Sequence, residues 1–168
     1  MQVVAELMAI AARTAPKAGG KDYLEIKVLS GSQLAELARA MVDYGQKTGR
    51  KNYDRDGDNV GRSSGVLLIG LKGARETGMD CGACGYPTCK ELPPLQPGGE
   101  FQGPICAWRL IDLGIALGSA AKTASILNAD NRIMYRIGVL AREMGLMEGE
   151  LVVGIPLSAT GKNIYFDR

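Results

Sequence analysis

Histidine is absent from this chain of 168 residues. Its absence excludes a Ser–His–Asp triad, a Cys–His pair, an imidazole proton shuttle, a Rieske centre and any zinc site with histidine ligands. Acid–base chemistry would therefore fall to carboxylates, lysine, tyrosine or a cofactor.

The chain also has no strong excess of charge and no long apolar run. Lys and Arg number 20 against 18 Asp and Glu, and a net charge of +2 is too small to predict nucleic-acid binding. No apolar run approaches the roughly 20 residues that cross a bilayer, and the N-terminal residues lack the cationic start of a secretory signal. We therefore expect a cytoplasmic protein without a nucleic-acid or membrane partner.

Aromatic residues make up only 5% of the chain, whereas glycine occurs 23 times and 46% of the residues are hydrophobic. This composition favours a real core with tight turns and close backbone contacts. The length suits one domain over residues 1–168.

Hydrophobic periodicity predicts an α/β fold with a mixed sheet packed by helices. Residues 47–64 are polar and are expected to form an exposed loop, and Pro156 is expected to end the last strand. Beyond that strand, residues 158–163 predict a flexible tail. The expected helices cover 2–13, 33–46, 107–128 and 133–145, and the expected strands cover 23–29, 65–71 and 151–155.

The stretch 107–128 is almost free of charge and rich in small residues. A helix that is apolar or small on all sides is buried on most of them. Gly114, Gly118 and Ser119 would let another backbone come close. We expect either the central helix of the domain or a helix at a dimer interface.

All four cysteines lie in one segment with the spacing C-x2-C-x4-C-x16-C. Four thiolates suit zinc or iron–sulfur, but structural zinc usually uses two C-x2-C pairs and this chain has one. Disulfides are disfavoured in a chain without an export signal. The spacing predicts one [4Fe–4S] cluster, with zinc and disulfides as alternatives, and Gly82 and Gly85 are expected to curl the loop and aim their N–H groups at cluster sulfurs. The predicted ligands are Cys81, Cys84, Cys89 and Cys106.

Residues 79–108 resemble a known cluster segment. The motif C-G-x-C-G-Y-P-x-C, followed by a distant cysteine, is similar to the four-cysteine domain of RnfB-type electron-transport subunits and of the large subunit of the corrinoid iron–sulfur protein. The resemblance implies one [4Fe–4S] cluster in a segment inserted into the domain.

The order of elements around Arg13-Thr14-Ala15-Pro16 resembles the nitroreductase-type flavoenzymes, as do the closing helices and the turn at Gly154-Ile155-Pro156. That resemblance implies a nitroreductase-like fold, bound FMN and a homodimer that completes the site. Lys17 and Lys21 or Asp22 depart from the Ser and Asn of the family's loop. The positions implied to bind the cofactor are Arg13, Thr14, Ala15, Pro16, Gly19, Gly154, Pro156 and Lys162.

The whole chain is similar to a ferredoxin domain-containing family (DUF2148-type) found in anaerobic bacteria and archaea, which implies no established reaction. The first functional hypothesis is an FMN-dependent oxidoreductase that acts on a small molecule and receives electrons from the cluster. The second is a one-electron carrier without flavin, which docks on a redox partner protein through Tyr86, Pro87 and the stretch 91–97. A structural metal site is the third.

Overall fold

The computed structural model describes residues 1–166 of the chain. Its α-helices are α1 (Gln2–Thr14), α2 (Gly31–Thr48), α3 (Tyr53–Gly61), α4 (Ala107–Ile126) and α5 (Tyr135–Glu143). The strands are β1 (Leu24–Leu29), β2 (Gly65–Leu71), β3 (Gln96–Pro97), β4 (Gln102–Gly103), β5 (Asp130–Asn131) and β6 (Leu151–Ser158), and short 3-10 turns cover Ala18–Gly20 and Cys89–Glu91.

The main sheet has the strand order β1-β2-β6-β5. Its pairs are antiparallel, so the expected α/β domain is confirmed but the sheet is not mixed. The reason lies in the connection between the first two strands: α2 and α3 form a hairpin that returns the chain to the end of the sheet where β1 finished. Leu29, the last residue of β1, therefore pairs with Val66 at the start of β2.

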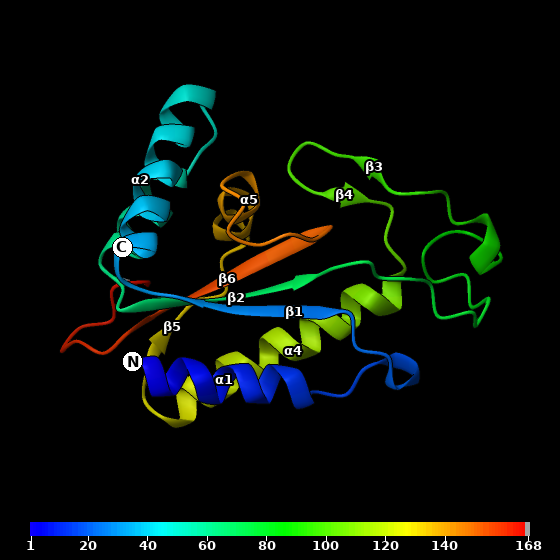
Figure 1. Cartoon of the computed structure of the whole chain (residues 1–168), viewed down its shortest axis with the longest axis horizontal. Coiled ribbons are helices and arrows are strands. Elements are labelled where there is room, and N and C mark those ends of the chain that lie inside the picture. The colour runs from blue at the N-terminus through cyan, green and yellow to red at the C-terminus, as the bar shows by residue number, and fades with distance from the viewer. Residues whose placement is uncertain (167–168) are drawn as a thin grey trace.

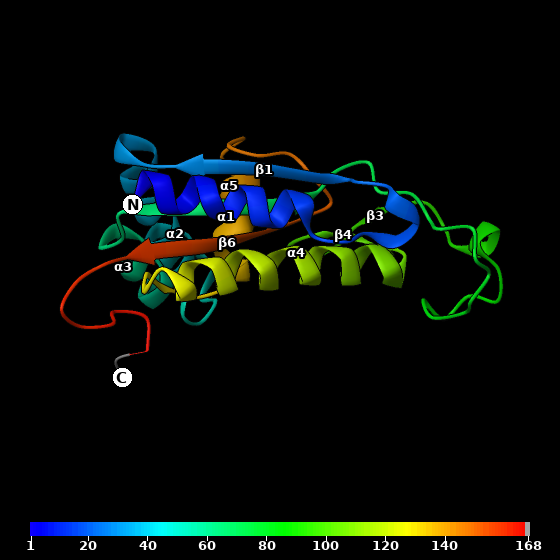
Figure 2. The same ribbon diagram turned by 90° about the horizontal axis from the view of Figure 1, so that it is seen from below.

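Helices cover both faces of this sheet (Figures 1 and 2). On β2, Val66 and Leu68 pack with α2, α3 and α5, whereas Leu67 and Ile69 pack with α1 and α4. This alternation follows from the period of two in a strand. Full burial of each such side chain stabilises the fold by about 1.5–3 kcal/mol, so the predicted continuous apolar run forms the centre of a three-layer domain.

Helix α1 packs along α4 through small side chains. Ala5, Met8 and Ala12 recur at helical spacing on α1 and are buried, and α4 buries Ala116 and Ala120. Because alanine projects little, the two helices can lie close to each other and to the sheet. The sequence prediction of both helices is confirmed.

The expected exposed loop over residues 47–64 is wrong in its second half, where α3 lies. Its Asp56 is 2% exposed and accepts hydrogen bonds from Arg55 and from Arg136 of α5. Gly57 lets α3 approach α2, because a Cβ there would stand 2.9 Å from the Ala38 carbonyl oxygen. The helix was not predicted because it has no apolar stripe; charge pairs and close packing hold it in place.

The prediction that Pro156 ends the last strand is also wrong, because β6 continues to Ser158. Gly154 donates its N–H to Met134, and residues two apart on a strand face the same side. The backbone nitrogen of Pro156 therefore points to the same side of β6 as the Gly154 N–H. On that side β6 pairs with Met134 and with Asn131, but no strand residue pairs with it between these two positions. Proline costs no sheet hydrogen bond at this position.

Helix α4 is buried on one side only. Leu110, Ile111 and Ile115 are at least 40% exposed, and a Cβ at Gly114 or Gly118 would meet no atom within 4 Å. This arrangement contradicts a central helix, and the alternative, a helix at a dimer interface, stays a prediction. Among residues 1–166, no helix combines the length and apolar character needed to cross a membrane.

Candidate functional site

The cysteine segment, residues 79–108, departs from the sheet after β2 and ends in the first turn of α4. It forms a loop that projects beyond one end of the sheet (Figure 1). Cys81 is exposed, Cys84 and Cys89 are partly buried, and Cys106 is buried. The segment therefore presents its first three cysteines toward solvent and its last one toward the body of the domain.

Cys81 lies beside α4 although 25 residues separate it from Cys106. The indole Nε1 of Trp108 donates a hydrogen bond to the Cys81 Sγ over 3.3 Å. The backbone N–H of Ala83 and the Trp108 indole lower the pKa of the Cys81 thiol below its ordinary value. Both donors favour the thiolate, which is the form that binds metals.

Cys106 is the residue that precedes α4, and its carbonyl oxygen accepts the N–H groups of Arg109 and Leu110. A helix N-terminus carries a partial positive charge. Cys106 lies at the N-terminus of the same helix whose Trp108 contacts Cys81. The first turn of α4 thus joins the two ends of the cysteine motif.

Left-handed backbone turns shape the segment between Cys81 and Cys89. Gly82 and Gly85 have φ values of 70° and 89°, as expected for residues that curl the loop. The Gly85 N–H donates to the Gly82 carbonyl oxygen over 2.9 Å and so does not point at a sulfur. The Asp80 carboxylate accepts the Cys89 N–H over 2.7 Å and closes the turn.

The four thiols do not converge in the structure. Each is a free cysteine, and residues 1–166 contain no group of three or more cysteine, aspartate or glutamate side chains placed to share a metal ion. Metal sites often form only as the ligands bind, because thiolates repel one another without the metal. The donor set itself fits a cluster: four thiols in one segment, one of them already bound by two N–H groups.

The stretch between Cys89 and Cys106 is held against the domain by the β3–β4 hairpin. Glu100 in its turn accepts a hydrogen bond from Tyr53 and pairs with Arg50 over 2.7 Å. Arg142 of α5 donates to the Glu100 carbonyl oxygen. The hairpin turn is therefore attached to the domain, whereas residues 91–97 are mostly exposed, and whether they act as a spacer or as a docking surface stays a prediction.

A buried ion pair in α4 joins the cysteine segment to the loop after α1. Arg109 and Asp112 are 2.9 Å apart with side chains 1% and 5% exposed. Arg109 also donates to the carbonyl oxygens of Arg75 and Ala18, and Asp112 accepts the Ala18 N–H. Three parts of the chain therefore meet at one pair, which the sequence pattern did not identify.

The loop proposed to bind flavin has its cations engaged within the chain. Arg13 pairs with Asp22 over 2.6 Å and donates to the Leu24 carbonyl oxygen. Burial raises the pKa of Asp22, but hydrogen bonds from Arg13 and the Leu24 N–H outweigh it and hold that pKa below the usual value. Lys17, which replaces the serine of the flavin family, donates to three carbonyl oxygens at the end of α1.

The other expected flavin positions lie elsewhere. Gly154 and Pro156 are buried within β6, and Ile137 of α5 occupies the space beside Gly154. Lys162 follows β6, at the end of the sheet opposite the loop after α1 (Figures 1 and 2). One chain therefore does not bring Arg13 and Lys162 around a common cavity.

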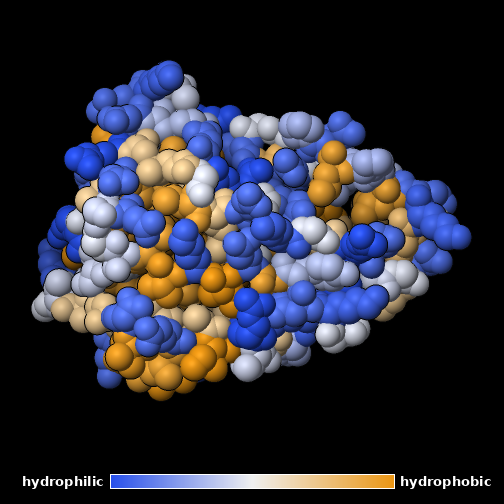
Figure 3. Space-filling model, viewed as in Figure 1, coloured by the Kyte–Doolittle hydropathy of each residue, from blue (hydrophilic) through white to orange (hydrophobic). Residues whose placement is uncertain are grey.

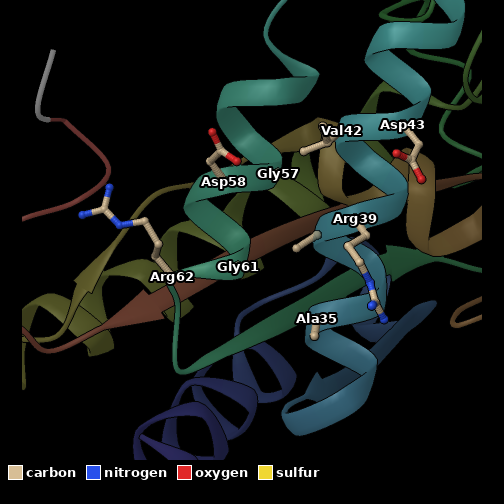
Figure 4. Close-up of a pocket in the computed structure, with 9 residues that line it drawn as sticks. Ala35, Arg39, Val42, Asp43, Gly57, Asp58, Gly61 and Arg62 are labelled. Atoms are coloured by element: carbon tan, nitrogen blue, oxygen red, sulfur yellow. The ribbon is translucent and has the colours of Figure 1, made fainter.

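The surface has two hollows that bear on a ligand site. A groove of about 570 Å³ lies between α2 and α3 and carries both signs of charge, from Arg39, Asp43, Asp58 and Arg62 (Figure 4). A smaller one of about 320 Å³ is lined by Ala9, Ile10, Arg13, Thr14 and Ile26. Only the second touches positions that the sequence analysis singled out.

Solved structures with a similar arrangement of elements include nitroreductases. One is a nitroreductase with bound FMN from Desulfitobacterium hafniense DCB-2, with a TM-score of 0.62 and 14% identity over 96% of this chain and 79% of that one. Another is NfnB from Mycobacterium smegmatis in complex with NADPH, with a TM-score of 0.64 and 11% identity over the same shares. The fold is therefore the nitroreductase fold, as the sequence resemblance implied.

A protein of Archaeoglobus fulgidus is 46% identical over 169 residues, which cover 100% of this chain and 91% of that protein. Residues 102–168 match the family described as "Uncharacterized protein containing a ferredoxin domain (DUF2148)". The chain belongs to this family, in agreement with the resemblance found in its sequence.

Proposed function

We propose that this protein is a redox protein that binds one [4Fe–4S] cluster through Cys81, Cys84, Cys89 and Cys106. The observation that carries the proposal is the position of Cys81 beside the helix that starts at Cys106. The family's ferredoxin domain and the nitroreductase fold support a redox role. When bound, the cluster would supply the transfer of single electrons.

The chain's own residues would hold and tune this group. The N–H groups of Ala83 and Trp108 bind one ligand sulfur, and the Asp80 carboxylate fixes the turn that carries Cys89. Arg109 and Asp112 hold the loop at Ala18 against the same helix. Residues 79–108 thus act as a cluster-binding insertion in a single domain over residues 1–168.

FMN is the second cofactor of the proposal, and the oxidoreductase would act on a small molecule. It is supported by the FMN of the structural neighbour and by the hollow beside Arg13 and Thr14. Arg13, Thr14, Ala15, Pro16 and Gly19 of one chain would meet Gly154, Pro156 and Lys162 only if a second chain contributed one of the two sets. The flavin site therefore requires a homodimer.

The alternative, a one-electron carrier without flavin, has its own support. Arg13 is already neutralised by Asp22, and Lys17 caps the end of α1. Neither cation is placed in this chain to receive a phosphate without breaking these contacts. Such a carrier would serve a redox partner protein in the cytoplasm.

We expect the anaerobically purified protein to show a broad brown absorption that bleaches on reduction, because thiolate-to-iron bands dominate the visible spectrum of such a cluster. Resolved flavin bands above it would support the oxidoreductase, and a cluster spectrum alone would support the carrier. Cys106→Ser is expected to remove the brown band. The control Ser125→Cys, which makes the reverse exchange in α4, is expected to keep it. A colourless protein that stays colourless after iron and sulfide reconstitution and holds one zinc ion would contradict the proposal.

The dimer is expected to form through the outer surfaces of α1 and α4. Both helices lie on one face of the sheet, and each exposes apolar side chains, including Ile10 at 59% and Ile115 at 40%. Hydrophobic residues gather along the lower part of Figure 3, where α1 lies in Figure 1. Such an exposed patch marks an interaction site more often than free surface.

Replacing Ile115 with glutamate is expected to convert the dimer into a monomer, because a buried unpaired carboxylate opposes association. Light scattering coupled to gel filtration measures the mass. The control Gln33→Glu adds the same charge on the exposed surface of α2 and is expected to leave the dimer intact. A wild-type chain that stays monomeric up to high micromolar concentration would exclude this interface.

A further inference from the structure

The first turn of α4 holds a side-chain donor that binds a sulfur atom. Trp108 is the single tryptophan of the chain, and its indole nitrogen is a donor that cannot accept. Among residues 1–166, its partner is the Cys81 Sγ at 3.3 Å. Trp108 as a whole is 37% exposed.

Resting on the proposed cluster, we infer that Trp108 is a positioning residue that binds the Cys81 sulfur and raises the reduction potential of the cluster. The inference assigns a role to a residue outside the cysteine motif. It also names Cys81 as the ligand whose electronic state the domain controls most directly.

The backbone around Trp108 is held by its neighbours, which limits the directions in which the indole can point. It lies between Cys106, which begins α4, and Arg109, which is 1% exposed and bound to three groups. Within the described chain the indole forms no stacked-ring or cation contact with a neighbour. Packing against another aromatic ring therefore does not explain its position.

The direction of the effect follows from charge. Reduction adds one electron to the cluster and its thiolates, so a hydrogen bond to a ligand sulfur is stronger in the reduced state. A donor that favours the reduced state raises the potential. Removing the indole N–H while keeping a ring of similar shape is expected to lower it.

The test compares Trp108→Phe with Tyr135→Phe, which removes a hydroxyl group from the exposed residue at the start of α5, outside the cysteine segment. After anaerobic reconstitution with iron and sulfide, a redox titration followed by electron paramagnetic resonance gives each midpoint potential. We expect the ratio of reduced to oxidised Trp108→Phe at the wild-type midpoint to fall about threefold, or ~28 mV for a one-electron couple. Tyr135→Phe is expected to match the wild type.

A second measurement needs no variant. With ¹⁵N-labelled tryptophan the chain gives one indole N–H signal, and a proton bonded to a cluster ligand is shifted or broadened when the paramagnetic cluster is bound. We expect the apo and reconstituted proteins to differ strongly at this signal. An unchanged signal, or equal potentials for Trp108→Phe and the wild type, would overturn the role of Trp108.

These results separate the two proposals. If the wild-type chain binds no cluster after reconstitution, the proposed function fails and takes this inference with it. If the wild type and both variants bind a cluster with the same potential, only the role of Trp108 fails.

Discussion

Replacing Asp112 with alanine is expected to destabilise the protein by about 3–5 kcal/mol, since this is the cost of leaving a buried charge without its partner. The charge left without its partner is the guanidinium of Arg109, a residue that is 1% exposed. The substitution also removes the acceptor of the Ala18 N–H. The free energy of unfolding from urea titration measures the loss.

Two variants control for this prediction. Asp22→Ala breaks the Arg13–Asp22 pair, whose side chains are 49% and 29% exposed, and an exposed pair contributes at most about 1 kcal/mol. Asp112→Asn keeps an acceptor oxygen, so its loss in the free energy of unfolding is expected to lie between the losses of Asp112→Ala and Asp22→Ala. Equal losses for Asp112→Ala and Asp22→Ala would show that the buried pair does not hold α4, the loop at Ala18 and the chain at Arg75 together.

A second large effect is expected from Gly138→Ala in α5. A Cβ at this position would collide with the carbonyl oxygen and carbon of Val152 in β6. Backbone atoms in the centre of a sheet cannot move aside as a flexible side chain can, so α5 would have to shift away from β6. Overpacking usually costs 1–3 kcal/mol, and a clash with central backbone is expected to cost about 3 kcal/mol or more, seen as a lower midpoint in thermal unfolding.

Gly61→Ala in α3 is the matched control. Its Cβ would lie 3.5 Å from the Ala38 Cβ, which is an ordinary contact. Alanine is favoured over glycine in helices by up to about 1 kcal/mol, so this variant is expected to be neutral or slightly stabilising. A Gly138→Ala protein as stable as Gly61→Ala would mean that α5 does not pack on β6 as described.

Much of the fold could be predicted from local patterns. The stretch 65–71 is apolar at every position and forms the fully buried centre of the sheet. The apolar stripe of α2 also agrees with its burial, since Leu34, Leu37 and Met41 are among its buried positions. Such elements are specified by a pattern that repeats within a few residues.

The elements that were missed depend on partners far away in the chain. Asp56 belongs to a buried helix because Arg136, 80 residues later, neutralises it. Arg109 and Asp112 look like two interruptions of an apolar helix, but they bind Ala18, 91 and 94 residues earlier. No local pattern encodes these pairings, so the charged centre that joins the two candidate sites could not be located in the sequence.

The candidate site was predictable in its residue types but not in its geometry. The spacing of the cysteines predicts a cluster site, and the structure adds the indole of Trp108, which lies outside the cysteine motif. For the expected flavin positions, the structure does not bring the predicted residues together within one chain. The resemblance places them in an N-terminal loop and a C-terminal turn that would share one site, whereas in a single chain the loop after α1 and the segment after β6 lie toward opposite ends of the sheet.

The N-terminus and the last described residues lie at the same end of the molecule, whereas the cysteine segment projects from the opposite end (Figure 1). A tether attached at either terminus would consequently turn the exposed thiols and Trp108 away from a support. On an electrode this orientation would place the long axis of the domain between the metal surface and the cysteines.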